Sequence, residues 1–142
     1  SEMCIRDRVT RVRKMFRNDM ACYKARAEAV RHAEVYRGSF AISVCPSENV
    51  ESPTIVGAQA ANELLNIIGI KASFVLTEYN DKIYISSRSI DEINVQIIME
   101  KLGGGGHLNV AGAQLTGVTI VQAKRMIQDT LDEMLKEGDI EE

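Results

Sequence analysis

Residues 103–112 read Gly-Gly-Gly-Gly-His-Leu-Asn-Val-Ala-Gly and are the most informative stretch of the chain. Four consecutive glycines are rare in a folded domain, because glycine loses more backbone entropy on folding than any other residue. A short amphipathic stretch ends where the run begins, and a histidine follows it. This pattern indicates that a ligand lies directly against the backbone with an imidazole at its edge, and phosphate suits such a place best.

Length and composition predict one globular domain. The chain has 142 residues, of which 45% are hydrophobic and 26% are charged. The net charge of −3 argues against duplex nucleic acid as a partner. No run approaches the roughly 20 apolar residues of a membrane span, and no signal-peptide core is present, so we expect no direct membrane contact. The cysteines Cys4, Cys22 and Cys45 lack metal-ligand spacing and fit a reducing compartment, which predicts a cytoplasmic location.

Hydrophobic periodicity predicts an α/β fold: a single domain with a mixed β-sheet flanked by helices, preceded by a long N-terminal helix. The expected helices span residues 9–37, 55–68, 95–102 and 120–134, and the expected strands span residues 40–45, 70–77, 82–87 and 114–116. We expect Gly38 to end the first helix and residues 78–81 to form a four-residue hairpin loop. Asn94 is expected to cap one helix, and Thr119 with Gln122 is expected to form a capping box on the last.

The two ends of the chain are set apart from this domain. Residues 1–8 show no periodicity, and we interpret them as a scar of sequence assembly without functional weight. Residues 138–142 form an acidic tail. The excess of basic side chains over residues 1–37 has two interpretations, a surface for an anionic or acidic partner and a solvated helix face.

The glycine run does not match the common phosphate-binding motifs. It follows a predicted helix, and it lacks both the Lys-Ser/Thr pair of a P-loop and the spacing of a dinucleotide fingerprint. Successive amides in such a loop can still form a concave nest for an anion. The alternative is a flexible linker, but the flanking residues are apolar rather than rich in Ser, Gln or Pro.

Three side chains near the run are candidate ligand groups. His107 can donate to a phosphate oxygen or act as a general acid, although a lone histidine is often structural. Arg88 ends a predicted strand and offers a planar, charged fork for a phosphate, or else pairs with Asp91 or Glu92. Asn109 can offer its amide to a base or ribose, or cap a helix that starts near residue 110.

The sequence holds no sign of a reaction centre. Phosphoester hydrolysis generally needs a metal-activated water or a positioned general base. We find no Asp and His cluster at ligand spacing, and the acidic residues crowd the last helix and the tail. The chain is therefore expected to have no metal ligands and no catalytic residues of its own.

Residues 102–112, LGGGGHLNVAG, are similar to the signature of the DHH-associated domain. That domain is the C-terminal lobe of DHH-type phosphoesterases, which include RecJ-like nucleases and oligoribonucleases. Within this superfamily, the longer phrases resemble the cyclic di-AMP phosphodiesterases of Firmicutes over roughly residues 9–137. These phrases are RVRKMFRNDMACYKARAEAV, AQAANELLNI, KASFVLT and NVQIIMEKLGGGGHLNVAGAQL.

The resemblance implies that one lobe binds the catalytic metal ions and a second lobe binds the substrate. A DHH lobe, which is not found in this sequence, carries Asp and His ligands for two manganese ions in that family. Residues 38–137 would be the substrate-binding DHH-associated domain, and residues 9–37 the connector helix between the lobes. The implied substrate-binding residues are Gly103, Gly104, Gly105, Gly106, His107, Arg88, Ser89 and Asn109.

The resemblance also implies partners and leaves alternatives open. The expected ligands are cyclic di-AMP or linear pApA, the expected protein partner is the DHH lobe, and a homodimer is possible. Members of the family are membrane-anchored, with this domain in the cytoplasm. One alternative is a nucleic-acid-binding lobe of the RecJ or alanyl-tRNA synthetase type. Another is an interaction domain without a ligand, docked through residues 9–37.

Overall fold

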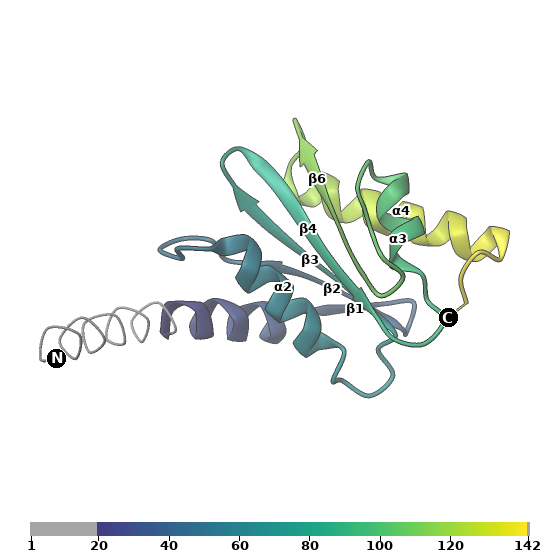
Figure 1. Ribbon diagram of the computed structural model, residues 1–142, viewed down its shortest axis with the longest axis horizontal. Helices are drawn as coiled ribbons and strands as arrows, with labels where there is room; N and C mark the ends of the chain where they lie inside the picture. The colour runs from purple at the N-terminus through teal and green to yellow at the C-terminus, as the bar shows by residue number, and fades with distance from the viewer. Residues whose placement is uncertain (1–19, 142) are drawn as a thin grey trace, which may run out of the picture.

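The computed structural model describes residues 20–141, which form a sheet with helices on both faces (Figure 1). Within these residues the sheet has six strands in the order β1-β2-β3-β4-β6-β5. The strands are β1 (Glu34–Tyr36), β2 (Phe40–Cys45), β3 (Ala72–Tyr79), β4 (Lys82–Ser89), β5 (Gly105–Gly106) and β6 (Val110–Thr116). β2 and β3 pair in parallel and every other neighbouring pair is antiparallel. The predicted mixed sheet in a single α/β domain is confirmed.

Two hydrophobic clusters hold the helices against the sheet. The helix over residues 20–31 and α2 (Pro53–Leu64) cover one face, where small residues such as Ala29 and Ala61 allow close packing. α3 (Val95–Lys101) and α4 (Ile120–Glu137) cover the other face. There the larger core side chains meet, including Phe74, Ile98 and Leu131, all fully buried. Successive side chains of a strand point to opposite faces of the sheet, so β2 and β3 contribute apolar side chains to both clusters.

The expected helix caps are present. The Asn94 side chain accepts hydrogen bonds from the backbone N–H groups of Gln96 and Ile97 at 3.0 and 3.3 Å. Thr119 and Gln122 form the reciprocal capping box, with bonds of 2.9 and 3.1 Å. These side chains satisfy backbone donors that the first helical turn leaves without partners. They fix where α3 and α4 begin relative to the strands before them.

The structure corrects the expected end of the first helix. The predicted helix over residues 9–37 ends at residue 31, and its part before residue 20 lies outside the described residues, as do residues 1–8. Residues Glu34–Tyr36 form the edge strand β1, and Gly38 (φ +78°) lies in the turn that leads into β2 rather than at a helix end. The turn is held to α4 because Asp132 accepts hydrogen bonds from Tyr36 and Arg37. A three-residue strand was too short for its alternation to stand out from the helical pattern.

Three other boundaries differ from the expectation. The hairpin between β3 and β4 has the two-residue turn Asn80-Asp81, with positive φ at both positions, instead of a four-residue loop. Such a turn matches the twist of the flanking strands. α2 ends at Leu64, before the predicted residue 68. β6 begins at Val110, four residues before the predicted strand, so Asn109 does not cap a helix.

Candidate functional site

Polar side chains of β4 lie on the same face of the sheet as α2. Tyr84, Ser86 and Arg88 alternate with Ile83, Ile85 and Ser87, which are buried toward α3 and α4. α2 packs over β3 and β4, but on β6 the residues of this face remain exposed or half-buried, unlike Ala111, Ala113 and Leu115. We call the surface formed by β4, β6 and the glycine run on this side the open face. It carries polar side chains of β4 together with the exposed Val110 of β6.

Arg88 is half-buried on the open face and has no ion pair within residues 20–141. It lies opposite Ser73 on β3 and Val110 on β6, and its Nη1 donates a hydrogen bond of 2.8 Å to the carbonyl oxygen of Ser87. Burial lowers the pKa of Arg88 below its ordinary value. The alternative expectation, a pair with Asp91 or Glu92, is wrong. A partly desolvated guanidinium without a carboxylate is a poised site for an anion.

The first two glycines of the run end α3. The N–H of Gly103 donates to the carbonyl of Glu100 at 3.1 Å, and that of Gly104 donates to the carbonyl of Met99 at 2.8 Å. Gly103 has φ of +87°, a conformation that terminates helices and favours glycine. These two amides are therefore engaged within the protein and do not contribute N–H groups to an anion nest.

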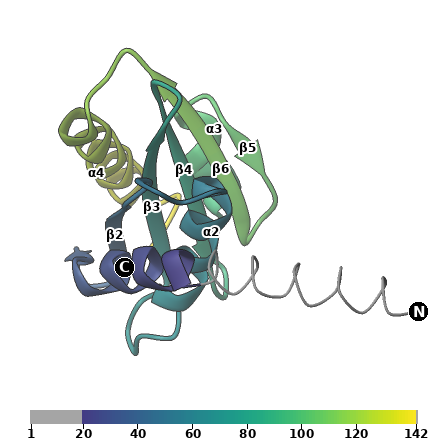
Figure 2. The ribbon, with the colours of Figure 1, turned by 90° about the vertical axis from the view of Figure 1, so that its left-hand side faces the viewer.

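The last two glycines form β5, the edge strand of the sheet (Figure 2). Gly105 pairs with Gly112 and Gly106 with Ala111, and the next pair is joined by a 2.7 Å bond from the His107 N–H to the Val110 carbonyl. Because hydrogen-bonded and non-bonded pairs alternate in an antiparallel ladder, the N–H of Gly106 turns away from β6. A Cβ on Gly106 would lie 2.6 Å from the Cα of Ala111. The run needs glycine for this close approach, and it leaves an amide at the sheet edge.

His107 follows β5 and has an exposed side chain. Residues paired across an antiparallel ladder project to the same face, so His107 shares the open face with Val110 and Arg88. His107 and Arg88 are two strand spacings apart, about 10 Å between their backbones. The pairing thus puts the arginine and the imidazole on the same side of the sheet, whereas the outward N–H of Gly106 points away from β6 and from Arg88.

Asn109 and Ser89 join the β5–β6 hairpin, which carries His107, to the end of β4. The Asn109 Nδ2 donates a 2.9 Å hydrogen bond to the Ser89 Oγ, and the Ser89 N–H donates to the Asn109 carbonyl at 3.0 Å. The Ser89 hydroxyl donates to the carbonyl of Ile93 at 2.6 Å. Ser89 is only 5% exposed. Both side chains thus make hydrogen bonds within the protein that fasten the hairpin to the end of β4.

A cavity of about 550 Å³ opens on the open face beside the glycine run. Its lining comes from the start of α2, the middle of β4 and β6, and the first glycines: Thr54, Tyr84, Ile85, Ser86, Gly103, Gly104, Gly112, Ala113 and Gln114. We did not single out Thr54, Tyr84 and Gln114 from the sequence. The alternation of polar Tyr84, Ser86 and Arg88 with two isoleucines was the signal that could have found part of this lining.

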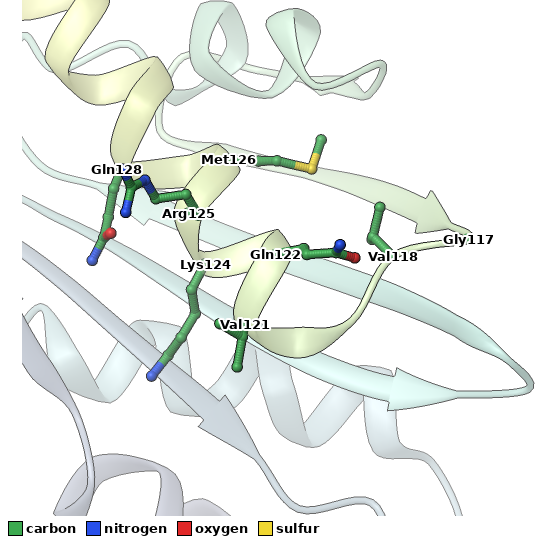
Figure 3. Close-up of a pocket in the computed structure, with 8 residues that line it drawn as sticks. All are labelled: Gly117, Val118, Val121, Gln122, Lys124, Arg125, Met126 and Gln128. Carbon is green, nitrogen blue, oxygen red and sulfur yellow. The ribbon is translucent and has the colours of Figure 1, made fainter.

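A second hollow, of about 680 Å³, lies on α4 and the turn before it (Figure 3). All its lining residues come from this one segment, among them Val118, Val121 and Met126. Neither the glycine run nor Arg88 contributes to it. It therefore stands apart from the residues that the sequence singled out.

Neither a metal site nor a membrane span emerges from the described part of the chain. Within residues 20–141 no group of three or more His, Cys, Asp or Glu side chains could hold a metal ion. No helix among the same residues is long and apolar enough to cross a membrane. The cation on the open face is Arg88, which suits an anion instead.

These features define an α/β domain that presents a guanidinium, an imidazole and bare backbone on one face of its sheet. Residues 38–137 match the DHHA1 domain, and the chain belongs to that family. It is a domain of the kind associated with DHH-family phosphodiesterases, as the resemblance of its glycine and histidine motif implied.

The chain is also similar in sequence to cyclic-di-AMP phosphodiesterases. The chain is 42% identical over 122 residues to the cyclic-di-AMP phosphodiesterase PdeA of Listeria monocytogenes, covering 85% of this chain and 18% of that protein. It is 37% identical over 128 residues to the cyclic-di-AMP phosphodiesterase GdpP of Geobacillus thermodenitrificans, covering 89% and 19%. The chain thus spans about a fifth of the length of these relatives.

A solved structure supports the fold. The exopolyphosphatase-related protein of Bacteroides fragilis superposes with a TM-score of 0.69 at 22% identity, covering 80% of this chain and 34% of that one. At this identity the likeness concerns the fold alone.

Proposed function

We propose that this domain is the substrate-binding lobe of a cyclic di-AMP phosphodiesterase, and that its open face holds a nucleotide phosphate. The observation that carries the proposal is Arg88, a half-buried guanidinium without an ion pair in residues 20–141. The names of the relatives, cyclic-di-AMP phosphodiesterases, supply the ligand class. The proposed ligands are cyclic di-AMP and its linear product pApA.

Each residue of the site has a role in this proposal. Arg88 neutralises the phosphate and donates to its oxygens, since a planar guanidinium can make two parallel bonds to such an anion. The imidazole of His107 donates from the far side of β6, opposite Arg88. Gly103, Gly104 and Gly105 keep side chains out of the ligand's approach. Ser89 and Asn109 are positioning residues, because they fasten the hairpin to β4.

The manganese implied by the resemblance has no place among the described residues. Residues 20–141 offer no set of side chains that fits a metal ion. We therefore assign no step through a metal and no catalytic residue to this chain. In this proposal a DHH lobe supplies the reaction centre, and the domain described here binds and orients the substrate.

Calorimetry with the 142-residue chain and pApA tests the proposal. We expect wild type to bind, and Arg88→Ala to lose at least about tenfold in affinity, the cost of a charge-assisted hydrogen bond. His107→Ala should weaken binding, while His32→Ala should not, because His32 pairs with Glu28 on the helix over residues 20–31. Unchanged binding by Arg88→Ala, or hydrolysis of cyclic di-AMP by the purified chain, would overturn the assignment.

Salt dependence separates this proposal from the nucleic-acid alternative. A lobe that tracks the backbone of a long single strand loses affinity steeply as salt rises, because many counterions are released on binding. A pocket for one dinucleotide should show a shallow dependence and no preference for longer strands. Tighter binding of a long single strand than of pApA, with a steep salt slope, would favour the alternative.

A further inference from the structure

We propose that the cavity beside the glycine run is a nucleobase pocket in which Tyr84 stacks on the base and Gln114 selects adenine. The inference rests on the proposed function, since it concerns the base of the nucleotide whose phosphate meets Arg88. In this proposal the residues that recognise the base lie outside the glycine and histidine motif. Thr54 forms the wall of this pocket on the α2 side.

The polar side chains of the pocket have no partners within the described residues. No hydrogen bond or ion pair in residues 20–141 engages the side chains of Thr54, Tyr84 or Gln114. Nearby polar groups behave differently: Ser73 donates to the carbonyl of Ala61 at 2.7 Å, and Asn109 is bound to Ser89. The buried hydroxyls of Thr77 and Ser87 also have no partner within residues 20–141, but they are closed off from solvent. The polar side chains that line the pocket are therefore the ones available to a ligand.

The shape of the cavity suits a flat ring. Its volume of about 550 Å³ is in the range of small-molecule sites. Its floor at Gly103 and Gly112 is bare backbone, and a Cβ on Gly112 would lie 2.8 Å from the carbonyl oxygen of Ile85. Because neither glycine carries a side chain, a ring can lie against the backbone at this floor.

Tyr84 and Gln114 are placed to act on one base. They face each other directly across β4 and β6, so their Cβ atoms are about 5 Å apart on the open face. A tyrosine ring offers a stacking surface to any base. The glutamine amide presents one donor and one acceptor side by side, which match N7 and N6 of adenine, whereas guanine presents two acceptors there. The pair therefore predicts preference for adenine.

The pocket and the phosphate groups lie within the reach of one ligand. Arg88 is four residues beyond Tyr84 on β4, roughly 13 Å along the strand, with Ser86 between them on the same face. The arginine side chain shortens this span. One extended nucleotide can thus place its base over Tyr84 and its phosphate near Arg88.

The test compares the affinities of pApA, pGpG and pUpU for the 142-residue chain and its variants. Wild type should prefer pApA. Gln114→Ala should weaken pApA about tenfold and leave pGpG nearly unchanged, so that the preference shrinks. Tyr84→Leu should weaken all three by about fivefold or more, and Tyr84→Phe, which keeps the ring, should restore affinity. Gln128→Ala, on α4, is the matched control and should behave like wild type.

The outcomes separate this inference from the proposed function. If Arg88→Ala abolishes binding while Gln114→Ala and Tyr84→Leu keep both the affinity and the adenine preference, the base pocket is refuted and the phosphate site stands. If Arg88→Ala has no effect, or if no dinucleotide binds, the proposed function fails and the base pocket fails with it. Thermal unfolding of each variant, followed by circular dichroism, verifies its fold, and Gln114→Ala carries the comparison if Tyr84→Leu does not fold.

Discussion

The side-chain amide of Asn109 donates a hydrogen bond to the hydroxyl of Ser89 over 2.9 Å, which fastens the β5–β6 hairpin to the end of β4. A backbone hydrogen bond of 2.9 Å, from the N–H of Val95 to the carbonyl of Leu108, fastens the same hairpin to the start of α3. The tip that carries His107 is thus held from two sides. Its position relative to Arg88 is set by the fold before any ligand arrives.

Asn109→Ala should loosen the hairpin. The change removes the donor to Ser89 and should lower the free energy of unfolding by about 1 kcal/mol, the usual net value of one hydrogen bond. Affinity for pApA should fall as well, because the imidazole of His107 loses its fixed place. Urea unfolding and calorimetry measure the two effects. A loss of affinity without any loss of stability would instead make Asn109 a direct ligand contact.

Gly104→Ala and Gly105→Ala form a matched pair. A Cβ on Gly104 would clash with the Gly112 carbonyl oxygen and lie 2.7 Å from the Cα of Ala113, whereas one on Gly105 meets nothing within 4 Å. We expect Gly104→Ala to cost about 1–3 kcal/mol of stability, as overpacking does. Gly105→Ala should stay within about 0.5 kcal/mol of wild type. Equal costs in thermal unfolding would contradict the close approach of the run to β6.

Arg88→Met should separate binding from stability. The methionine fills similar space without burying a cation that lacks a carboxylate partner in residues 20–141. Stability should therefore stay the same or rise by up to about 1 kcal/mol, while binding of pApA is lost. The control Arg125→Met, at an exposed residue paired with Asp129, should leave binding intact. A marked loss of stability in Arg88→Met would point to a structural role for the guanidinium.

Acid should weaken the contact between α4 and the turn after β1. A hydrogen bond from Tyr36, and then one from Arg37, hold the pKa of Asp132 below its ordinary value of 3.8. Because the folded-state pKa is the lower one, this stabilisation is present above pH 3.8 and is lost as the pH falls through the folded value. Asp132→Asn should lose less free energy of unfolding than wild type as the pH falls from about 6 to well below 3.8. If urea titrations give the same pH dependence of the free energy of unfolding for wild type and Asp132→Asn, this expectation is wrong.

The sequence predicted the parts of the fold that depend on local patterns. The caps at Asn94 and Thr119 follow from the residue types that can accept bonds from a first helical turn, and the structure confirms both. The edge strand Glu34–Tyr36 was missed because its pairing with β2 depends on residues that follow it in the chain. A strand of three residues has too little alternation of its own to be recognised.

The candidate site was predicted in part, for a similar reason. Arg88 and His107 stand out by chemistry and by their place around the glycine run, and the structure puts them on one face. The division of the glycines between a helix end and an edge strand could not be predicted, because it depends on where β6 packs. Tyr84 and Gln114 lie 30 residues apart in the numbering and become neighbours only through the β4–β6 pairing.

Binding of a nucleotide phosphate to the open face can be tested by a chemical-shift titration of the ¹⁵N-labelled chain with pApA, without added metal. We expect progressive shifts at Arg88, Gly106 and His107 and around Tyr84 and Gln114, with α4 unaffected. The same titration of Arg88→Ala should show little change at these positions. Shifts confined to α4 and the hollow around Val121, or no shifts at saturating pApA, would contradict the claim that the open face binds a nucleotide phosphate.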